Sequence, residues 1–198
     1  MTAVPKKKLT EAEYLAIERA AEFKSEFYNG EMFAMAGASR QHNELKENLI
    51  GELFNRLKGG PCRTYSADQR VKVERTGLYT YPDLLIVCGS PEFELTDGIV
   101  TLRNPEVVIE IMSKSTEHYD RGKKFGHYRQ LPSLREYVLV AEDQPHIERY
   151  VRQTDGSWLL TVFDGPAGEF PFVTVTATIP LADVYRGVEL PTDSSPGL

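Results

Sequence analysis

One acidic residue inside an apolar segment constrains this chain more than any other feature. Residues 104–113 run Asn-Pro-Glu-Val-Val-Ile-Glu-Ile-Met-Ser, and the β-branched residues after the Asn-Pro pair predict a strand. The nearly continuous apolarity indicates that both faces of this strand are covered. Glu110 lies in its middle, and an ionised carboxylate is almost never fully buried unless it is paired or binds a metal, because its desolvation is costly. Something must therefore compensate the charge of Glu110.

A second apolar segment, residues 81–88, also carries a carboxylate. Pro82 is tolerable only at the start of a strand or on an edge strand, and Asp83 directly precedes the hydrophobic block. If the two segments are neighbouring strands, Asp83 and Glu110 lie close together, so that either one is protonated or a cation lies between them. Oxygen ligands of this kind suit Mg²⁺ or Mn²⁺. The alternative is an aspartate at a strand end and a core glutamate paired with an arginine.

The composition indicates a single domain without a membrane span. The 198 residues predict one domain over residues 9–190 with flexible tails at 1–8 and 191–198. No apolar stretch reaches 18 residues, and the basic N-terminus is not followed by an apolar segment, so we expect a cytoplasmic protein. The formal net charge of −6 argues against bulk electrostatic binding of nucleic acid, so any such contact needs a local basic patch.

The two cysteines, Cys62 and Cys88, are too few for a disulfide framework or a zinc cluster. We therefore expect both to be small buried hydrophobic residues. The chain also contains no glycine-rich phosphate loop, no Gly-x-Ser-x-Gly segment and no His-Glu-x-x-His segment, which disfavours the chemistries that use them.

Periodicity and turn residues predict an α/β (α+β) fold with a mixed central sheet. The expected elements are a capped helix at 9–19, a hairpin around Asn29-Gly30, a helix after Ser39 ending at Gly59-Gly60, strands within 62–73, the two apolar strands, a helix at about 120–130, and strands at 134–141, 147–152, 158–163 and 172–178. Residues 89–98 are expected to form a loop. The last three strands alternate apolar and polar residues, which predicts extra antiparallel, half-buried strands at the C-terminal end.

The combination of these segments resembles a known family, the Uma-two family of restriction-endonuclease-like proteins within the PD-(D/E)xK nuclease superfamily. The segments that carry the resemblance are Pro82-Asp83, Glu110-Ile-Met-Ser113-Lys-Ser-Thr116, Tyr119-Asp-Arg-Gly-Lys-Lys-Phe125 and Pro132-Ser-Leu-Arg-Glu-Tyr137. It extends more loosely to Glu26, Gly30, Glu31 and His42, and so covers most of residues 10 to 142.

The resemblance implies a metal-dependent phosphodiesterase fold in which Asp83 and Glu110 hold Mg²⁺ or Mn²⁺ on adjacent strands. It also assigns Ile111, next to Glu110, to the metal site. The superfamily pattern places a lysine two residues after the glutamate, but this position is Met112 here. In this family the resemblance implies that the catalytic lysine has moved to the following helix.

Helix geometry chooses between the two lysines of that helix. Lys123 is rotated by about 200° from Phe125, whereas Lys124 lies within about 40° of Tyr128, on the flank of the expected buried face. We therefore expect Lys124 to reach the strand of Glu110 and to be catalytic. The alternative is a solvated Lys124 paired with Asp120 one turn earlier.

Two further residues are possible substrate-contacting or supporting residues. His42 could contact a water molecule or a phosphate, but a core histidine with its hydrogen bonds satisfied explains it equally well. Ser113 could contact a phosphate, but a turn that leads into the helix explains it equally well.

Three functions remain open. The first is an endonuclease that cleaves nucleic acid, with DNA as the expected substrate. The second is a nuclease fold without turnover that binds nucleic acid or protein. The third is a structural domain. The strands within residues 147–178 are expected to join two copies into a symmetric homodimer.

Overall fold

The computed structural model describes residues 8–96 and 98–191. The helical segments are α1 (Glu11–Ala20), α2 (Arg40–Leu57), α3 (Glu117–Tyr119), the π-helical turn η1 (Asp120–Lys124), α4 (Phe125–Tyr128) and α5 (Leu181–Val184). The strands are β1 (Ser25–Tyr28), β2 (Glu31–Ala34), β3 (Cys62–Ser66), β4 (Arg70–Val73), β5 (Leu78–Thr80), β6 (Leu84–Cys88), β7 (Phe93–Thr96), β8 (Ile99–Leu102), β9 (Val107–Met112), β10 (Glu136–Ala141), β11 (His146–Arg152), β12 (Trp158–Asp164), β13 (Glu169–Pro171) and β14 (Thr178–Pro180).

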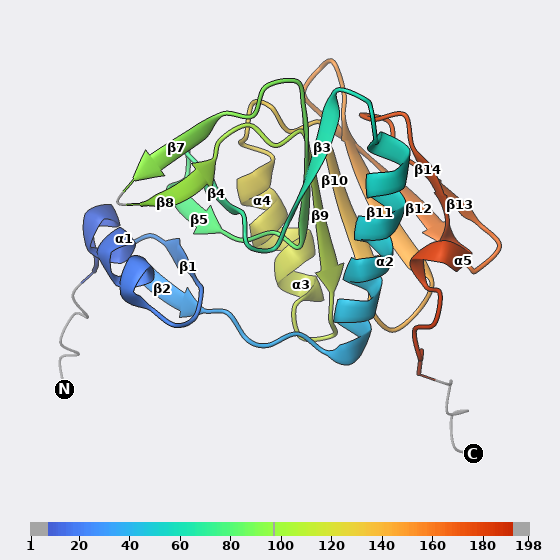
Figure 1. Ribbon diagram of the computed structural model, residues 1–198, viewed down its shortest axis with the longest axis horizontal. Helices are drawn as coiled ribbons and strands as arrows, with labels where there is room; N and C mark the ends of the chain where they lie inside the picture. Colours follow the sequence, from blue (N-terminus) through green and yellow to red (C-terminus); the bar gives the residue numbers. More distant parts are fainter. Residues whose placement is uncertain (1–7, 97, 192–198) are drawn as a thin grey trace.

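Two six-stranded sheets form the frame of the molecule. The central sheet has the order β12-β11-β10-β9-β6-β3, and the second sheet has the order β2-β1-β5-β4-β8-β7. Figure 1 shows α1, β1 and β2 at one end of the molecule and β13, β14 and α5 at the other. The central sheet is mixed, because β10 runs parallel to β9 while all other neighbouring strands of the sheet are antiparallel. The predicted α/β (α+β) class with a mixed central sheet is therefore confirmed.

Strand β9 is the centre of this sheet, as its apolar sequence predicts. All six of its residues are buried, between β6 on one side and β10 on the other. Two parallel strands need a crossover connection, and the helical segment from Glu117 to Tyr128 provides it between β9 and β10. This crossover carries the helix predicted at about 120–130 and brings it onto the sheet.

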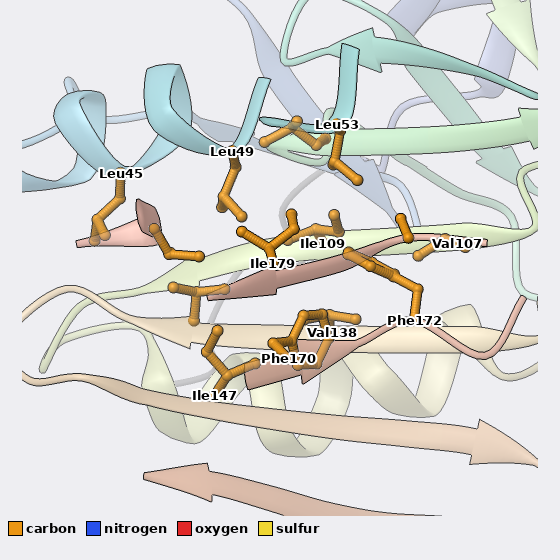
Figure 2. Packing of buried hydrophobic residues seen from close by; sticks show 14 of the residues in the cluster. Leu45, Leu49, Leu53, Val107, Ile109, Val138, Ile147, Phe170, Phe172 and Ile179 are labelled. Carbon is orange, nitrogen blue, oxygen red and sulfur yellow. The ribbon is translucent and has the colours of Figure 1, made fainter. Parts of the chain in front are cut away.

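Alternate residues of the central strands face two different cores. On one face, Leu45, Leu49 and Leu53 of α2 pack against Val107 and Ile109 of β9, and Figure 2 shows the three leucines pointing toward the strands. This core also takes in the segments around β13, β14 and α5. The i, i+4 spacing of the leucines is what places them on one helix face.

The opposite face of the central sheet packs against the second sheet and the crossover helix. Leu85 of β6, Val108 of β9 and Leu139 of β10 lie in one cluster with Val71 of β4 and Tyr128 of α4. The central sheet is therefore the middle layer, which explains why β9 and β10 are apolar on both faces.

The N-terminal elements follow their local signals. Thr10 caps α1, and Glu13 closes the predicted capping box. Asn29 and Gly30 have φ values of 51° and 82°, which are the left-handed conformations that a tight hairpin turn between β1 and β2 requires. The hairpin predicted around these two residues is confirmed.

Two predicted segments are wrong. Residues 89–98 were expected to form a loop, but the chain forms β7 there and pairs it with β8. Residues 172–178 were expected to form a strand, but only Thr178 belongs to one, β14. Phe172, Val175 and Ala177 enter the core individually, which produces an apolar pattern without a ladder.

The expectation for the cysteines is also wrong. Cys62 and Cys88 are half-buried and form a disulfide bond. They lie directly opposite each other because the β3–β6 register pairs them. A two-cysteine count excludes a framework of several bonds, but it does not exclude one bond between paired strands.

The predicted tails at 1–8 and 191–198 lie almost wholly outside the described residues. Among the helices that the structure describes, none is both long and apolar enough to cross a membrane.

Candidate active site

Glu110 lies on β9, and Asp83 comes just before the neighbouring strand β6, so the two lie close together as expected. The antiparallel β6–β9 register pairs Leu84 with Ile109, so Asp83 directly precedes β6 at the level of Glu110. The Asp83 carboxylate accepts a hydrogen bond from the backbone N–H of Ile111 at 2.9 Å. Burial alone raises the pKa of Asp83, but the His42 ring and the Ile111 N–H outweigh it and lower that pKa. Asp83 is therefore an ionised carboxylate held at the carboxyl end of β9.

Glu110 is buried and is bound by two side chains of the crossover helix. Its Oε1 atom lies 2.9 Å from Lys124 Nζ and accepts a hydrogen bond from the Tyr128 hydroxyl at 2.7 Å. Burial raises the pKa of Glu110 to about 8, and the nearby Asp83 and Asp120 contribute, although Lys124 opposes this. Near neutral pH the Glu110 carboxyl group therefore tends to bind a proton unless a further cation approaches it.

Lys124 is the buried lysine of the pair, and Lys123 is exposed. Burial by itself lowers the pKa of Lys124, but the carboxylates of Glu110, Glu26 and Asp120 raise it overall, so the side chain remains an ammonium ion. It lies in a π-helical turn, a distortion that is found often at functional sites. The predicted choice of Lys124 over Lys123 for contact with Glu110 is confirmed, while its catalytic role stays a prediction.

Two carboxylates of the cluster were not predicted as site residues. Glu26 Oε1 of β1 and Asp120 Oδ1 of η1 each lie 3.7 Å from Lys124 Nζ. Glu26 was singled out only through the family resemblance, and Asp120 only as an alternative partner of a solvated lysine. Asp120 could have been predicted as a site residue from its position four residues before Lys124, a lysine on the buried face of the helix.

The remaining predicted residues divide into two groups. His42 joins the site: its Nε2 atom lies 2.8 Å from Asp83 Oδ1, and its backbone N–H donates to the Ser39 hydroxyl that caps α2. Ile111 joins it through the backbone contact to Asp83. Ser113 does not contact these groups, since its hydroxyl lies 2.9 Å from that of Ser115 in the turn after β9.

Carboxylate oxygens such as these are the ligands that hard divalent cations prefer. Three carboxylates, from Glu26, Glu110 and Asp120, lie within 3.7 Å of the ammonium of Lys124, and Asp83 is close enough to Glu110 for its charge to raise the pKa of Glu110. Within residues 8–96 and 98–191, no three His, Cys, Asp or Glu side chains are spaced as a ready metal-binding group. An ion held by one or two carboxylates, with water completing its shell, is the usual arrangement of Mg²⁺ in proteins.

A pocket of about 220 Å³ lies where β9 and β10 end. Its lining comes from the ends of the parallel strands β9 and β10 and from the start of the crossover: Met112, Ser113, Lys114, Glu117, Arg121, Ala141, Asp143 and Gln144. Ligands in α/β sheets commonly bind beyond the carboxyl ends of parallel strands.

Comparison with known proteins agrees with this architecture. Residues 11–182 match the Uma2 family, whose description is "Putative restriction endonuclease". The chain is 36% identical over 173 residues to the uncharacterized protein sll1609 of Synechocystis sp., covering 87% of this chain and 97% of that one. It is 31% identical over 186 residues to slr1290 of the same organism, also named as uncharacterized, covering 94% and 96%.

A solved structure shares the fold. It is titled a putative nuclease belonging to DUF820 from Anabaena variabilis, and it superposes with a TM-score of 0.70 at 18% sequence identity. The match covers 88% of this chain and 96% of that one. This likeness concerns the fold, and it agrees with the restriction-endonuclease-like architecture expected from the sequence.

Proposed function

Because the chain belongs to the Uma2 family of putative restriction endonucleases, we propose that it is a metal-dependent endonuclease that hydrolyses phosphodiester bonds of nucleic acid. Asp83, Glu110 and Lys124 are its proposed catalytic residues. Mg²⁺ or Mn²⁺ is the proposed metal, and DNA the proposed substrate.

One observation carries the proposal: a buried lysine ammonium lies 2.9 Å from the carboxylate of Glu110 and 3.7 Å from those of Glu26 and Asp120. A purely structural ion pair needs one carboxylate for one ammonium. Additional buried carboxylates destabilise the fold unless a proton or a cation compensates them. Strongly perturbed groups that cluster in this way are typical of catalytic sites.

The site residues divide the work between binding and charge stabilisation. Asp83, Glu110 and the backbone of Ile111 would hold the metal, and His42 keeps the Asp83 carboxylate in place. A bound divalent cation would acidify a water molecule and polarise the phosphate. Lys124 contributes an ammonium that stabilises the negative charge developing on the phosphate oxygens.

The pocket that Ser113 lines contains cationic and acidic side chains in equal number. Lys114 and Arg121 line it with Glu117 and Asp143; Lys114 lies 3.7 Å from Asp143, and Arg121 is paired with Glu117 and Glu148. Because these cations are paired and the net charge is −6, attraction of a polyanion would have to come from the bound metal together with Lys124.

A cleavage assay tests the proposal. Purified protein is incubated with supercoiled plasmid, single-stranded DNA and RNA in Mg²⁺, in Mn²⁺ and in EDTA. We expect cleavage of DNA that depends on the metal and is absent in EDTA. Asp83→Asn and Glu110→Gln should each abolish cleavage while the melting temperature stays near that of the wild type, because both substitutions keep the side-chain shape.

The same experiment separates the alternatives. Binding of nucleic acid with no cleavage of any substrate at millimolar Mg²⁺ or Mn²⁺ would indicate a binding module that uses the fold without turnover. Cleavage that persists in EDTA, or in the Glu110→Gln variant, would reject the proposed site.

A further inference from the structure

Strand β12 forms an open edge of the central sheet. It pairs with β11 along all seven of its residues, and nothing in the described chain pairs with its other side. An unpaired edge presents a row of backbone N–H and C=O groups that can bond to another strand. Monomeric proteins commonly protect such an edge with a lysine, a proline, a bulge or a short strand.

None of these protections is present in β12. Its sequence is Trp-Leu-Leu-Thr-Val-Phe-Asp, its register with β11 is continuous, and its only charged residue is the terminal Asp164. Three apolar side chains are exposed on it: Leu159 at 57%, Leu160 at 45% and Val162 at 43%. Because neighbouring side chains alternate between faces, the exposed apolar surface lies on both sides of the strand.

The other edges of the two large sheets are less suited to pairing. Strands β2 and β7 have four residues each, and β7 carries Glu94, which is paired with Arg103. Strand β3 has five residues and includes the exposed Arg63. Strand β12 is therefore both the longest edge and the most apolar one.

We propose that β12 pairs with β12 of a second copy of this chain, antiparallel and centred on Thr161, so that two central sheets join into one twelve-stranded sheet. The pairing is Trp158 with Asp164, Leu159 with Phe163, Leu160 with Val162, and Thr161 with its own copy. This register uses the full length of both strands, and every register centred elsewhere leaves residues unpaired.

The second copy fits this edge because the strand is complementary to itself. The Leu159–Phe163 and Leu160–Val162 pairs place apolar side chains opposite each other on both faces, and no like charges meet. Arg149 pairs with Thr161 from β11, but its guanidinium bonds to Pro171 O and lies 5.0 Å from the centre of the Phe163 ring. The Arg149 side chain is thus held against its own copy of the chain and does not oppose the pairing of the two β12 strands.

Light scattering and sedimentation test the contact through a matched pair of variants. Leu160→Lys places an ammonium in the interface and should raise the dimer dissociation constant at least about tenfold. The control is Phe54→Lys, a similarly exposed apolar residue of α2 at 60%, which should leave the constant within about twofold of the wild type. Both positions are at the surface, and unchanged melting temperatures would confirm that each variant folds.

A cysteine at the two-fold axis tests the register. Residues directly opposite each other in an antiparallel pair are close enough for a disulfide. Both native cysteines already form a disulfide, so the introduced thiol would be the only free one. Oxidised Thr161→Cys should form a covalent dimer, and Phe54→Cys should stay monomeric on a denaturing gel. A wild-type protein that is monomeric at tens of micromolar, or a dimer that neither variant affects, would overturn the proposal.

Discussion

At the scale of single residues, Glu110 is the group around which the other side chains of the site are arranged. Its carboxylate is buried, bonds to Lys124 and Tyr128, and lies near enough to Asp83 and Asp120 for their charges to raise its pKa. The strand is apolar at every position except this one, so burying the Glu110 carboxylate costs much desolvation free energy. That cost is understandable where the charge is needed to bind a cation.

The raised pKa of Glu110 predicts that metal binding releases a proton. Because this pKa is about 8, the group is mostly protonated at pH 6 and must lose its proton when a metal binds. The affinity for Mn²⁺ should therefore rise between pH 6 and pH 8 and level off above it. Titration calorimetry in buffers of different ionisation enthalpy measures the proton count. The Glu110→Gln variant should bind weakly, and a wild-type affinity that falls with rising pH would contradict the assignment.

A second prediction at this scale concerns His42, which orients Asp83 from α2. Removing a group that holds a metal-binding carboxylate typically costs 10- to 100-fold in metal affinity or activity. His42→Ala should therefore weaken Mn²⁺ binding by about that factor. The matched control is His118→Ala, since His118 is exposed on α3. Equal metal affinities for the two variants would remove His42 from the site.

The sequence predicts the strand residues of the site better than those supplied by other elements. Asp83 and Glu110 are recognisable because a carboxylate is conspicuous in an apolar segment. Glu26 lies in a short hairpin with one exposed strand, where a glutamate is ordinary, and only the tertiary structure brings it to Lys124.

At the scale of elements, the crossover between β9 and β10 positions Lys124 against Glu110. It begins directly after the strand of Glu110 and packs Tyr128 onto the same sheet face. The 3.6-residue rotation identifies the inward lysine correctly although part of this segment is a π-turn. This works because Lys124 and Tyr128 are only four residues apart, so the π-turn changes their relative direction little.

Two glycines allow a prediction about the elements that carry the site. Gly30 has φ of +82°, and an added Cβ would lie 2.6 Å from Lys8 Cβ, so Gly30→Ala should destabilise the protein by about 1–2 kcal/mol. Gly51 lies in α2 with open space around it, so Gly51→Ala should stabilise the protein by about 0.5–1 kcal/mol. Urea denaturation measures both changes. A Gly30→Ala variant as stable as the wild type would show that the hairpin turn is not constrained in this way.

Strands are harder to predict where their partners are distant or few. The segment that forms β7 is rich in turn residues and acids, and it becomes a strand only because β8 pairs with it. The apolar residues at 172–177 fill the core one by one, so their alternation indicates burial and not a ladder. In both cases pairing depends on the rest of the fold, which local patterns do not contain.

At the scale of the whole molecule, the disulfide ties the edge of the central sheet to its interior. The bond between Cys62 and Cys88 closes a segment of 26 residues that includes β4 and β5 of the second sheet. Loop-closure entropy gives such a bond a contribution of about 3 kcal/mol. Reduction should therefore lower the free energy of unfolding by roughly that amount. The Cys62→Ala/Cys88→Ala double variant should be insensitive to reductant, and a wild-type protein equally insensitive would contradict the bond's role.

The most direct test of the proposed function compares two adjacent lysines. Lys124→Met and Lys123→Met remove one ammonium each and keep side chains of similar length, but only Lys124 contacts Glu110. Metal-dependent DNA cleavage by Lys124→Met should fall by about 10²-fold or more, the loss expected when one charge-stabilising group is removed, while Lys123→Met should stay within about twofold of the wild type. Circular dichroism of both variants checks that they fold. Equal cleavage by the two variants, or a larger loss in Lys123→Met, would contradict the assignment of Lys124 and with it the proposed active site.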